Sequence, residues 1–163
     1  QNEYGIKKIN MVGHSLGNTS FMCYLLQAAH NPNLPRLNKQ VSIGGHFDGL
    51  DFKQLPIAIR QPANLRVNNE GKPNKMNATY REMAKLRTLY PTKEIDVLNI
   101  IGNIGGNSDG IVKNASSLSL EYLVAPMAKS YRVVTITGKN AEHGQLTYNK
   151  QVEKQIINFL WLQ

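Results

Sequence analysis

The sequence predicts an α/β fold built on an open, mostly parallel sheet. Apolar runs of strand length alternate with segments of helical periodicity, and most of the connections between the runs are long enough for crossovers. A length of 163 residues, 41% of them hydrophobic and 18% charged, is ordinary for one globular unit. We therefore expect a single domain over residues 1–163.

The first elements are a strand, a helix and a second strand. Residues 6–12 form an apolar-rich run that ends at a glycine. Residues 16–29 have helical periodicity, with Leu16, Thr19, Cys23 and Leu26 on the predicted apolar face. Cys23, the only cysteine, is therefore expected to be a buried structural thiol. Residues 40–45, QVSIGG, read as the second strand.

Two strands and a helix complete the predicted order of strand, helix, strand, strand, strand, helix. Residues 95–101 (IDVLNII) stop at the glycine-rich GNIGG, and residues 131–137 (YRVVTIT) stop at Gly138. Residues 149–162 place Val152, Ile156, Phe159 and Leu160 on one stripe, as in a helix that lies on a sheet.

Residues 46–94 interrupt this alternation. They contain four of the seven prolines and one clear helical pattern at residues 79–90, where Thr79 and Glu82 have capping-box spacing. An insertion of this length in a compact domain is usually functional, so we predict a cap or lid. Its polar composition leaves a disordered surface excursion as the alternative.

The charge and the motifs of the sequence limit the partners and cofactors that we expect for this protein. The net charge of +8 is compatible with contact to an anionic cell surface, but the basic residues are scattered and form no block longer than Lys7-Lys8. We therefore expect no nucleic-acid partner. The chain has no HExxH, no cysteine pair and no EF-hand loop, so no metal and no cofactor is expected.

The stretch VGHSLG places Ser15 between Gly13 and Gly17, at the junction of a predicted strand and a predicted helix. This context is typical of a nucleophile elbow, in which a sharp turn exposes the serine hydroxyl. Cβ atoms two residues before and after are expected to collide with the turn, so glycine is required at both positions. The N–H of Leu16 is then one donor of an oxyanion hole. The alternative is a glycine-rich turn without chemistry.

A serine nucleophile needs a base and an acid. Of the four histidines, His143 follows the last predicted strand, at the sheet edge where the loops after parallel strands converge. Asp109 follows the third predicted strand at the same edge, with Asp48 and Asp51 as rivals after the second. The order Ser15, Asp109, His143 is the chain order of α/β-hydrolase triads, which favours Asp109.

VGHSLG, GGHFDGL, NSDGIVKNASSL and EHGQL together resemble the α/β-hydrolase superfamily, and most of all its DUF915 branch of hydrolases from Gram-positive bacteria. The resemblance runs along the whole chain. It implies Ser15 as nucleophile, Asp109 as acid, His143 as base and residues 46–94 as a cap. It also implies an extracellular or cell-envelope location. The substrates of the branch are not established.

We accordingly predict a serine hydrolase that cleaves carboxylic esters or related acyl bonds of a small-molecule or lipid-like substrate. An acyltransferase or thioesterase would use the same triad. The alternative from another class is a non-catalytic module that binds an anionic cell-surface polymer in the cleft.

Complete folds of this type place several strands before the elbow strand, and a loop among them supplies the second oxyanion-hole donor. The sequence begins at Gln1, shortly before the predicted elbow strand at residues 6–12. We therefore expect an upstream segment of the same protein as a partner, with the N-terminal strands missing from this chain. Alone, the chain is expected to self-associate through the open edge of its elbow strand and to have little activity.

Overall fold

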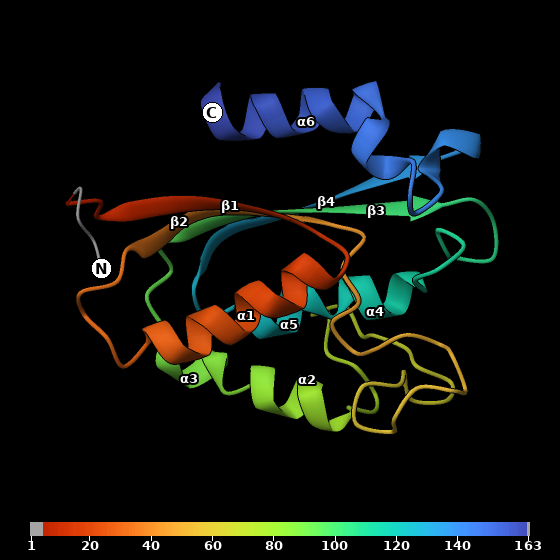
Figure 1. Ribbon diagram of the computed structural model, residues 1–163, viewed down its shortest axis with the longest axis horizontal. Coiled ribbons are helices and arrows are strands. Elements are labelled where there is room, and N and C mark those ends of the chain that lie inside the picture. The colour runs from red at the N-terminus through yellow and green to blue at the C-terminus, as the bar shows by residue number, and fades with distance from the viewer. Residues whose placement is uncertain (1–4, 163) are drawn as a thin grey trace.

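The computed structural model describes residues 5–162 and has one parallel sheet as its centre. Its strands, in chain order and in spatial order, are β1 (Lys8–His14), β2 (Arg36–Ile43), β3 (Ile95–Asn103) and β4 (Ala128–Thr137). Each strand pairs in parallel with the next, and the sheet stays open (Figure 1). The predicted fold class is thus confirmed. The predicted start of the domain at Gln1 lies outside the described residues.

Helices cover both faces of the sheet (Figure 1). One face carries α1 (Leu16–Ala28), α2 (Ala78–Met83), α3 (Leu86–Leu89), α4 (Asn114–Leu118) and α5 (Leu120–Val124). The other face carries α6 (Lys150–Trp161), which two short 3₁₀ turns, η1 (Lys139–Ala141) and η2 (Leu146–Tyr148), connect to β4.

Helices α4 and α5 correct the predicted order, in which one strand followed another directly between residues 101 and 131. Each helix has five residues, and the first is serine-rich (NASSL), so neither has enough residues or apolar periodicity to be recognised in the sequence. They provide the crossover from β3 to β4 on the same face as α1.

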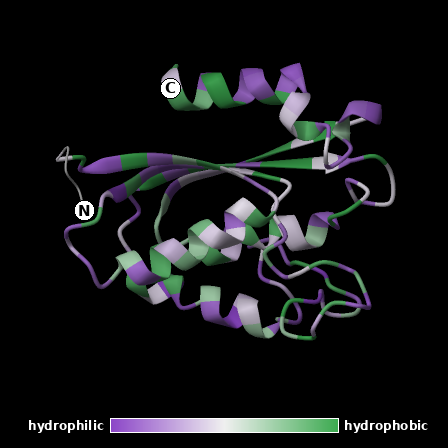
Figure 2. Ribbon diagram, viewed as in Figure 1, coloured by the Kyte–Doolittle hydropathy of each residue, from purple (hydrophilic) through white to green (hydrophobic). Residues whose placement is uncertain are grey.

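The two faces of the sheet bury separate hydrophobic clusters, and the strands between them show both hydrophobic and hydrophilic segments in Figure 2. The helix-rich face buries Phe21, Met22, Leu25, Phe47, Tyr80, Met83, Leu86, Ile95, Val97, Leu120, Leu123, Val124, Met127 and Ala128. The face under α6 buries Val41, Ile43, Leu98, Ile100, Ile136, Ala141, Leu146, Val152 and Phe159. The stripe predicted for the final helix is confirmed, since Val152 and Phe159 are buried in this cluster and Ile156 and Leu160 pack against it half-buried.

The predicted buried face of α1 is wrong. Its buried residues are Asn18, Phe21, Met22 and Leu25, whereas Cys23 is exposed and Leu16 is 64% exposed. The segment FMCYLL is apolar around most of the helix, so its periodicity cannot select the face. Packing against the sheet selects it instead.

The insertion contains two short helices where one was predicted, α2 and α3, which Ala84 and Lys85 separate. Asn77 caps α2, since its side-chain Oδ1 accepts the N–H of Tyr80 at 2.7 Å. Thr79 is therefore not the predicted cap, and its hydroxyl donates to the carbonyl of Ala58 instead. Tyr80, Met83 and Leu86 belong to the core, and their helices pack against α1 and α5, which argues against a disordered excursion.

Candidate active site

Ser15 lies between β1 and α1 in a strained backbone conformation, with φ 53° and ψ −121°. The strain is held by neighbours on both sides of the turn. The N–H of Ser15 donates to the carbonyl of Ile43 at 3.0 Å, and the Asn18 side chain donates to the carbonyl of Ser15 at 3.2 Å. A strained non-glycine residue that its surroundings hold in place is characteristic of functional sites.

The two glycines of the elbow have different roles. A Cβ on Gly13 would lie 2.7 Å from Oδ1 of Asn18, so a side chain there would displace the residue that clamps the turn. A Cβ on Gly17 would meet no such neighbour within 4 Å. The predicted steric requirement for glycine thus applies to Gly13 and is wrong for Gly17, because the chain is already in α1 at that position.

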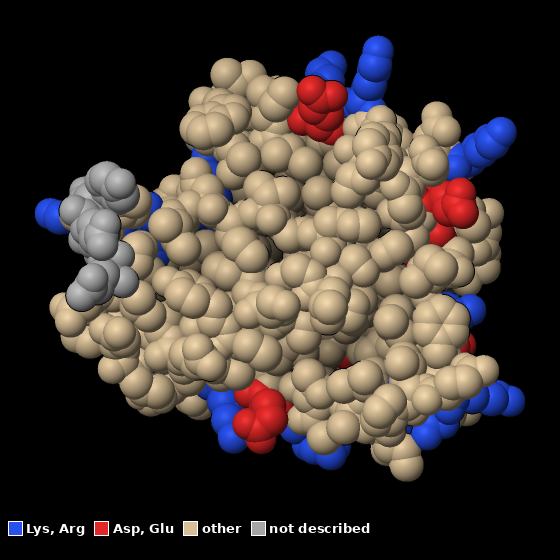
Figure 3. Space-filling view, in the orientation of Figure 1, with Lys and Arg blue, Asp and Glu red and all other residues tan. Residues whose placement is uncertain are grey.

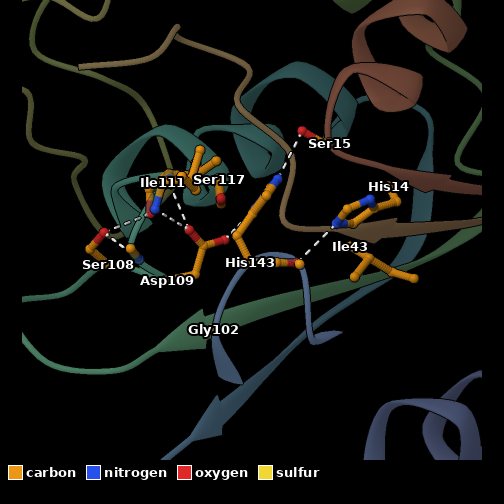
Figure 4. Close-up of polar contacts among 12 residues, drawn as sticks. His14, Ser15, Ile43, Gly102, Ser108, Asp109, Ile111, Ser117 and His143 are labelled. Carbon is orange, nitrogen blue, oxygen red and sulfur yellow. Dashed lines mark hydrogen bonds and ion pairs between the residues drawn. The ribbon is translucent and has the colours of Figure 1, made fainter. Parts of the chain in front are cut away.

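His143 follows η1 and reaches back to Ser15 (Figure 4). Its Nε2 lies 3.0 Å from Oγ of Ser15, and its Nδ1 lies 2.7 Å from Oδ2 of Asp109. The backbone N–H of His143 also donates to the carbonyl of Asp109 at 2.9 Å, so the two loops are joined twice. The side chains predicted as nucleophile, base and acid therefore form one chain of hydrogen bonds.

Asp109 is buried and fixed by its own loop. Its Oδ1 accepts the N–H of Val112 at 2.6 Å and that of Ile111 at 3.0 Å, which leaves Oδ2 for His143. A carboxylate only accepts hydrogen bonds, so Nδ1 of His143 carries the proton and Nε2 has a free lone pair. The lone pair is the acceptor that a serine hydroxyl needs if it is to be deprotonated.

Two glycines outside the elbow motif make room for the side chains of Asp109 and His143. Gly44, just after β2, has φ +54°, and a Cβ there would lie 3.0 Å from Nδ1 of His143 and 3.3 Å from Oδ2 of Asp109. At Gly102 a Cβ would lie 2.1 Å from the carbonyl oxygen of Ala141. The sequence signal for Gly44 was its place in a Gly-Gly pair at the end of a strand.

Asp48, the principal rival acid, is buried elsewhere. Its Oδ1 accepts the N–H of Asn77 at 2.9 Å, which ties the end of β2 to the start of α2. Burial raises the pKa of Asp48 to about 6, although the N–H of Asn77 and the charge of Arg81 oppose that rise. No hydrogen bond among the described residues joins Asp48 to His143. Asp51, the other rival, is exposed.

His14, next to the nucleophile, does contact the site. Its Nε2 donates to the backbone carbonyl of His143 at 3.1 Å, and the two imidazole rings lie 4.8 Å apart (Figure 4). Among the contacts of the described residues, it makes no hydrogen bond to Oγ of Ser15. His14 thus steadies the loop of His143 from the strand side.

A pocket of about 320 Å³ opens beside Ser15, and we call it the Ser15 pocket. It is lined by Ser15, Leu16, Thr19, His46, Phe47, Gly49, Leu50, Leu55, Ile59, Asn77 and Thr79. Most of these residues belong to the insertion, which therefore forms most of the wall. Burial lowers the pKa of His46, one of the lining residues, although a backbone hydrogen bond opposes this shift.

The N–H of Leu16 belongs to the first residue of α1, close to the hydroxyl of Ser15. The first N–H groups of a helix have no acceptor within the helix and carry part of its positive dipole. The start of α1 is thus compatible with the predicted oxyanion-hole donor, and this role of the Leu16 N–H stays a prediction.

The described residues contain neither a group of side chains arranged as a metal site nor a helix suited to span a membrane. Within residues 5–162 there is no group of three or more His, Cys, Asp or Glu side chains arranged to hold a metal ion. None of the helices in the same part of the chain is both long and apolar enough to cross a bilayer.

Comparison with known sequences and structures gives the context of this site. Residues 1–163 match the model of a family described as "Alpha/beta hydrolase of unknown function (DUF915)". A search of curated proteins found no match.

Two solved structures are similar to the chain. The product of the gene lin2722 from Listeria innocua superposes with a TM-score of 0.79 at 25% identity, over 98% of this chain and 60% of its own. A protein from Lactobacillus plantarum WCFS1, described as a "putative cell surface hydrolase", gives 0.69 at 20% identity, over 98% and 56%. This chain thus spans less than two thirds of the length of either protein.

Proposed function

Because the chain belongs to the DUF915 family of α/β hydrolases, we propose that it is a serine hydrolase that cleaves carboxylic esters or related acyl bonds. The observation that carries this proposal is the chain of hydrogen bonds from Ser15 through His143 to Asp109. The lone pair on Nε2, the strained elbow and the N–H of Leu16 are the three features that acyl transfer to a serine requires.

In the proposed reaction, Oγ of Ser15 attacks the carbonyl carbon of the ester and its proton passes to Nε2 of His143. The carbonyl π electrons move to the oxygen, and the N–H of Leu16 stabilises the resulting oxyanion. Asp109 accepts from Nδ1 and stabilises the imidazolium. The intermediate expels the alcohol, which takes the proton from His143, and leaves an acyl group on Ser15.

Water completes the cycle. His143 takes a proton from a water molecule, whose oxygen attacks the acyl carbon, and the second tetrahedral intermediate expels Ser15, which regains its proton. The products are a carboxylic acid and the free enzyme. At about 320 Å³, the Ser15 pocket is near the lower end of the usual range for ligand pockets, so we propose a short acyl chain.

The test is covalent labelling of the serine. A fluorophosphonate probe should form an adduct at Ser15 that mass spectrometry of the digested protein locates, and Ser15→Ala should abolish labelling with an unchanged circular dichroism spectrum. Hydrolysis of 4-nitrophenyl butyrate should disappear in the same variant. A ligand that binds the Ser15 pocket of a protein whose Ser15 resists the probe would instead support a non-catalytic module.

We also propose that the protein is located at the cell surface, by extension from the description of the Lactobacillus plantarum protein.

A further inference from the structure

A second cavity lies beside the Ser15 pocket, on the insertion. It has a volume of about 780 Å³, and we call it the cap groove. It is lined by Asp51, Lys53, Ile57, Ala58, Arg60, Gln61, Pro62, Ala63, Lys75, Met76, Asn77, Ala78 and Arg81. Asn77 lines both cavities, and Ile59 of the Ser15 pocket is followed directly by Arg60 of the cap groove. A molecule bound across Asn77 could therefore occupy both.

The cap groove is strongly cationic. Lys53, Arg60, Lys75 and Arg81 line it, and the only carboxylate among its lining residues is Asp51. Residues 51–81 contain six of the 19 Lys and Arg residues of the chain and two of the 11 Asp and Glu residues. Some of the Lys and Arg side chains in Figure 3 lie at the lower right, where the insertion lies in Figure 1, and others lie along the rest of the edge.

None of these four cations forms a direct ion pair with a carboxylate in the part of the chain that the structure describes. Three of them donate to backbone carbonyls instead: Arg60 to Lys53 at 3.2 Å, Arg81 to Met76 at 2.5 Å and, at a longer distance of 3.4 Å, Lys75 to Ala63. A hydrogen bond to a carbonyl holds a guanidinium in place but does not remove its positive charge. The remaining N–H donors of the guanidinium can bind the oxygens of a phosphate or a carboxylate.

We propose that the cap groove binds an anionic group on the alcohol part of the ester whose acyl chain enters the Ser15 pocket. The preferred substrates are then acyl esters of an alcohol that carries a phosphate or carboxylate. This inference rests on the proposed hydrolase function and adds the class of substrate. A purely solvated basic surface needs neither a concave shape nor a shared wall with the site of Ser15, and the cap groove has both.

The test compares two esters that differ in one group, 1-butyrylglycerol and 1-butyrylglycerol 3-phosphate, by the release of butyrate. The wild type should have the higher kcat/KM for the phosphate ester, mainly through a lower KM. In Arg60→Gln/Arg81→Gln the ratio of the two kcat/KM values should fall by about tenfold or more, since a hydrogen bond to a charged group contributes about 1.5–3 kcal/mol. Salt should reduce the ratio in the wild type, because the groove is exposed.

A second double variant tests the proposal independently, in case the first double variant does not fold. Lys53→Gln/Lys75→Gln removes two exposed charges, and Lys75 makes only a long contact of 3.4 Å to the carbonyl of Ala63. It should lower the ratio in the same direction. Lys154→Gln, on the exposed side of α6 across the sheet, is the matched control and should not change the ratio.

The outcomes separate the two proposals. Ser15-dependent hydrolysis of both esters with equal kcat/KM, or a ratio that the two double variants leave unchanged, would overturn the cap groove proposal and leave the hydrolase intact. Absence of hydrolysis together with absence of labelling at Ser15 would overturn the hydrolase. In that case, titration calorimetry of the wild type with glycerol 3-phosphate still tests the groove, and the proposal fails if no binding heat depends on Arg60 and Arg81.

Discussion

At the scale of single residues, Asp109 and Asp48 show how two buried carboxylates near one sheet edge take different tasks. Both are almost fully buried, and both accept backbone N–H groups. Asp109 uses its second oxygen on His143, whereas Oδ2 of Asp48 has no hydrogen-bond partner among the described residues. The contact of Asp109 with an imidazole points to chemistry, and the contact of Asp48 with the N–H of Asn77 points to anchoring of the insertion.

The first prediction concerns this difference. In Asp109→Asn, the amide NH₂ can turn toward Nδ1 of His143, which forces the proton onto Nε2 and removes the acceptor for Ser15. We expect kcat for 4-nitrophenyl butyrate to fall by up to about 10⁴-fold, the loss that this change causes in a serine protease triad. Asp48→Asn is the matched control and should lose far less. The reverse pattern would show that Asp48 is the acid.

The second prediction concerns pH and stability. Burial raises the pKa of Asp48 from 3.8 to about 6, so the folded state holds this proton over a range in which the unfolded state has released it. Its contribution to the free energy of unfolding is therefore largest below pH 4 and is lost as pH rises to about 6. At about 1.4 kcal/mol per pKa unit, the change is up to about 3 kcal/mol.

Urea unfolding at pH 4.5 and pH 7.5 measures this effect in the wild type and in Asp48→Asn. Other groups also titrate, so the informative quantity is the difference between the two proteins. The loss of stability between these pH values should be smaller in Asp48→Asn, because an amide does not titrate. Equal losses in both proteins would show that Asp48 has an ordinary pKa.

At the scale of elements, the turns around the site depend on a few glycines. The roles of these glycines differ from those that the Gly-x-Ser-x-Gly motif predicts. Gly17 lies in the first turn of α1 with open space at its Cβ position. Gly44 lies at the end of β2 with φ +54° and the side chains of Asp109 and His143 directly behind it. The third prediction contrasts the two.

Gly17→Ala should raise the free energy of unfolding by about 0.5–1 kcal/mol, because alanine loses less entropy in a helix. Gly44→Ala should lower it, since alanine is strained at this φ. It should also reduce kcat by about 10²-fold, because a Cβ 3.0 Å from Nδ1 displaces the imidazole. Thermal unfolding and ester turnover measure both effects. A destabilised Gly17→Ala protein would restore the steric argument for both glycines of the motif.

At the scale of the whole molecule, the sheet separates two hydrophobic clusters that must fold together if residues 1–163 are one domain, as predicted. Leu98 is fully buried under α6, and Leu120 is fully buried on the opposite face. The fourth prediction is that Leu98→Ala and Leu120→Ala each lower the free energy of unfolding by about 2–5 kcal/mol. Ile157→Ala, at a position that is 45% exposed, should change it by about 0.5 kcal/mol or less.

Circular dichroism and intrinsic fluorescence should follow one common transition in all three variants, because the loss of either cluster exposes the strands that both share. Two separate transitions, each sensitive to one of the leucines, would instead divide the chain into independent units.

The sequence by itself determined the sheet, the elbow and the places of Asp109 and His143. Apolar periodicity is a local property, and parallel strands bring the loops that follow them to one edge, so strand ends could be translated into neighbours in space. The distances of 2.7 Å and 3.0 Å that join these side chains agree with that inference.

Only the tertiary structure decided which face of α1 is buried, where α4 and α5 form, and why Gly44 has no side chain. Each of these depends on contacts between segments far apart in the chain, which no local pattern records. The same holds for Lys53, Arg60, Lys75 and Arg81. They look scattered in the sequence, and the fold of the insertion brings them around one groove, while Tyr80, Met83 and Leu86 hold its helices in the core beside α1 and α5.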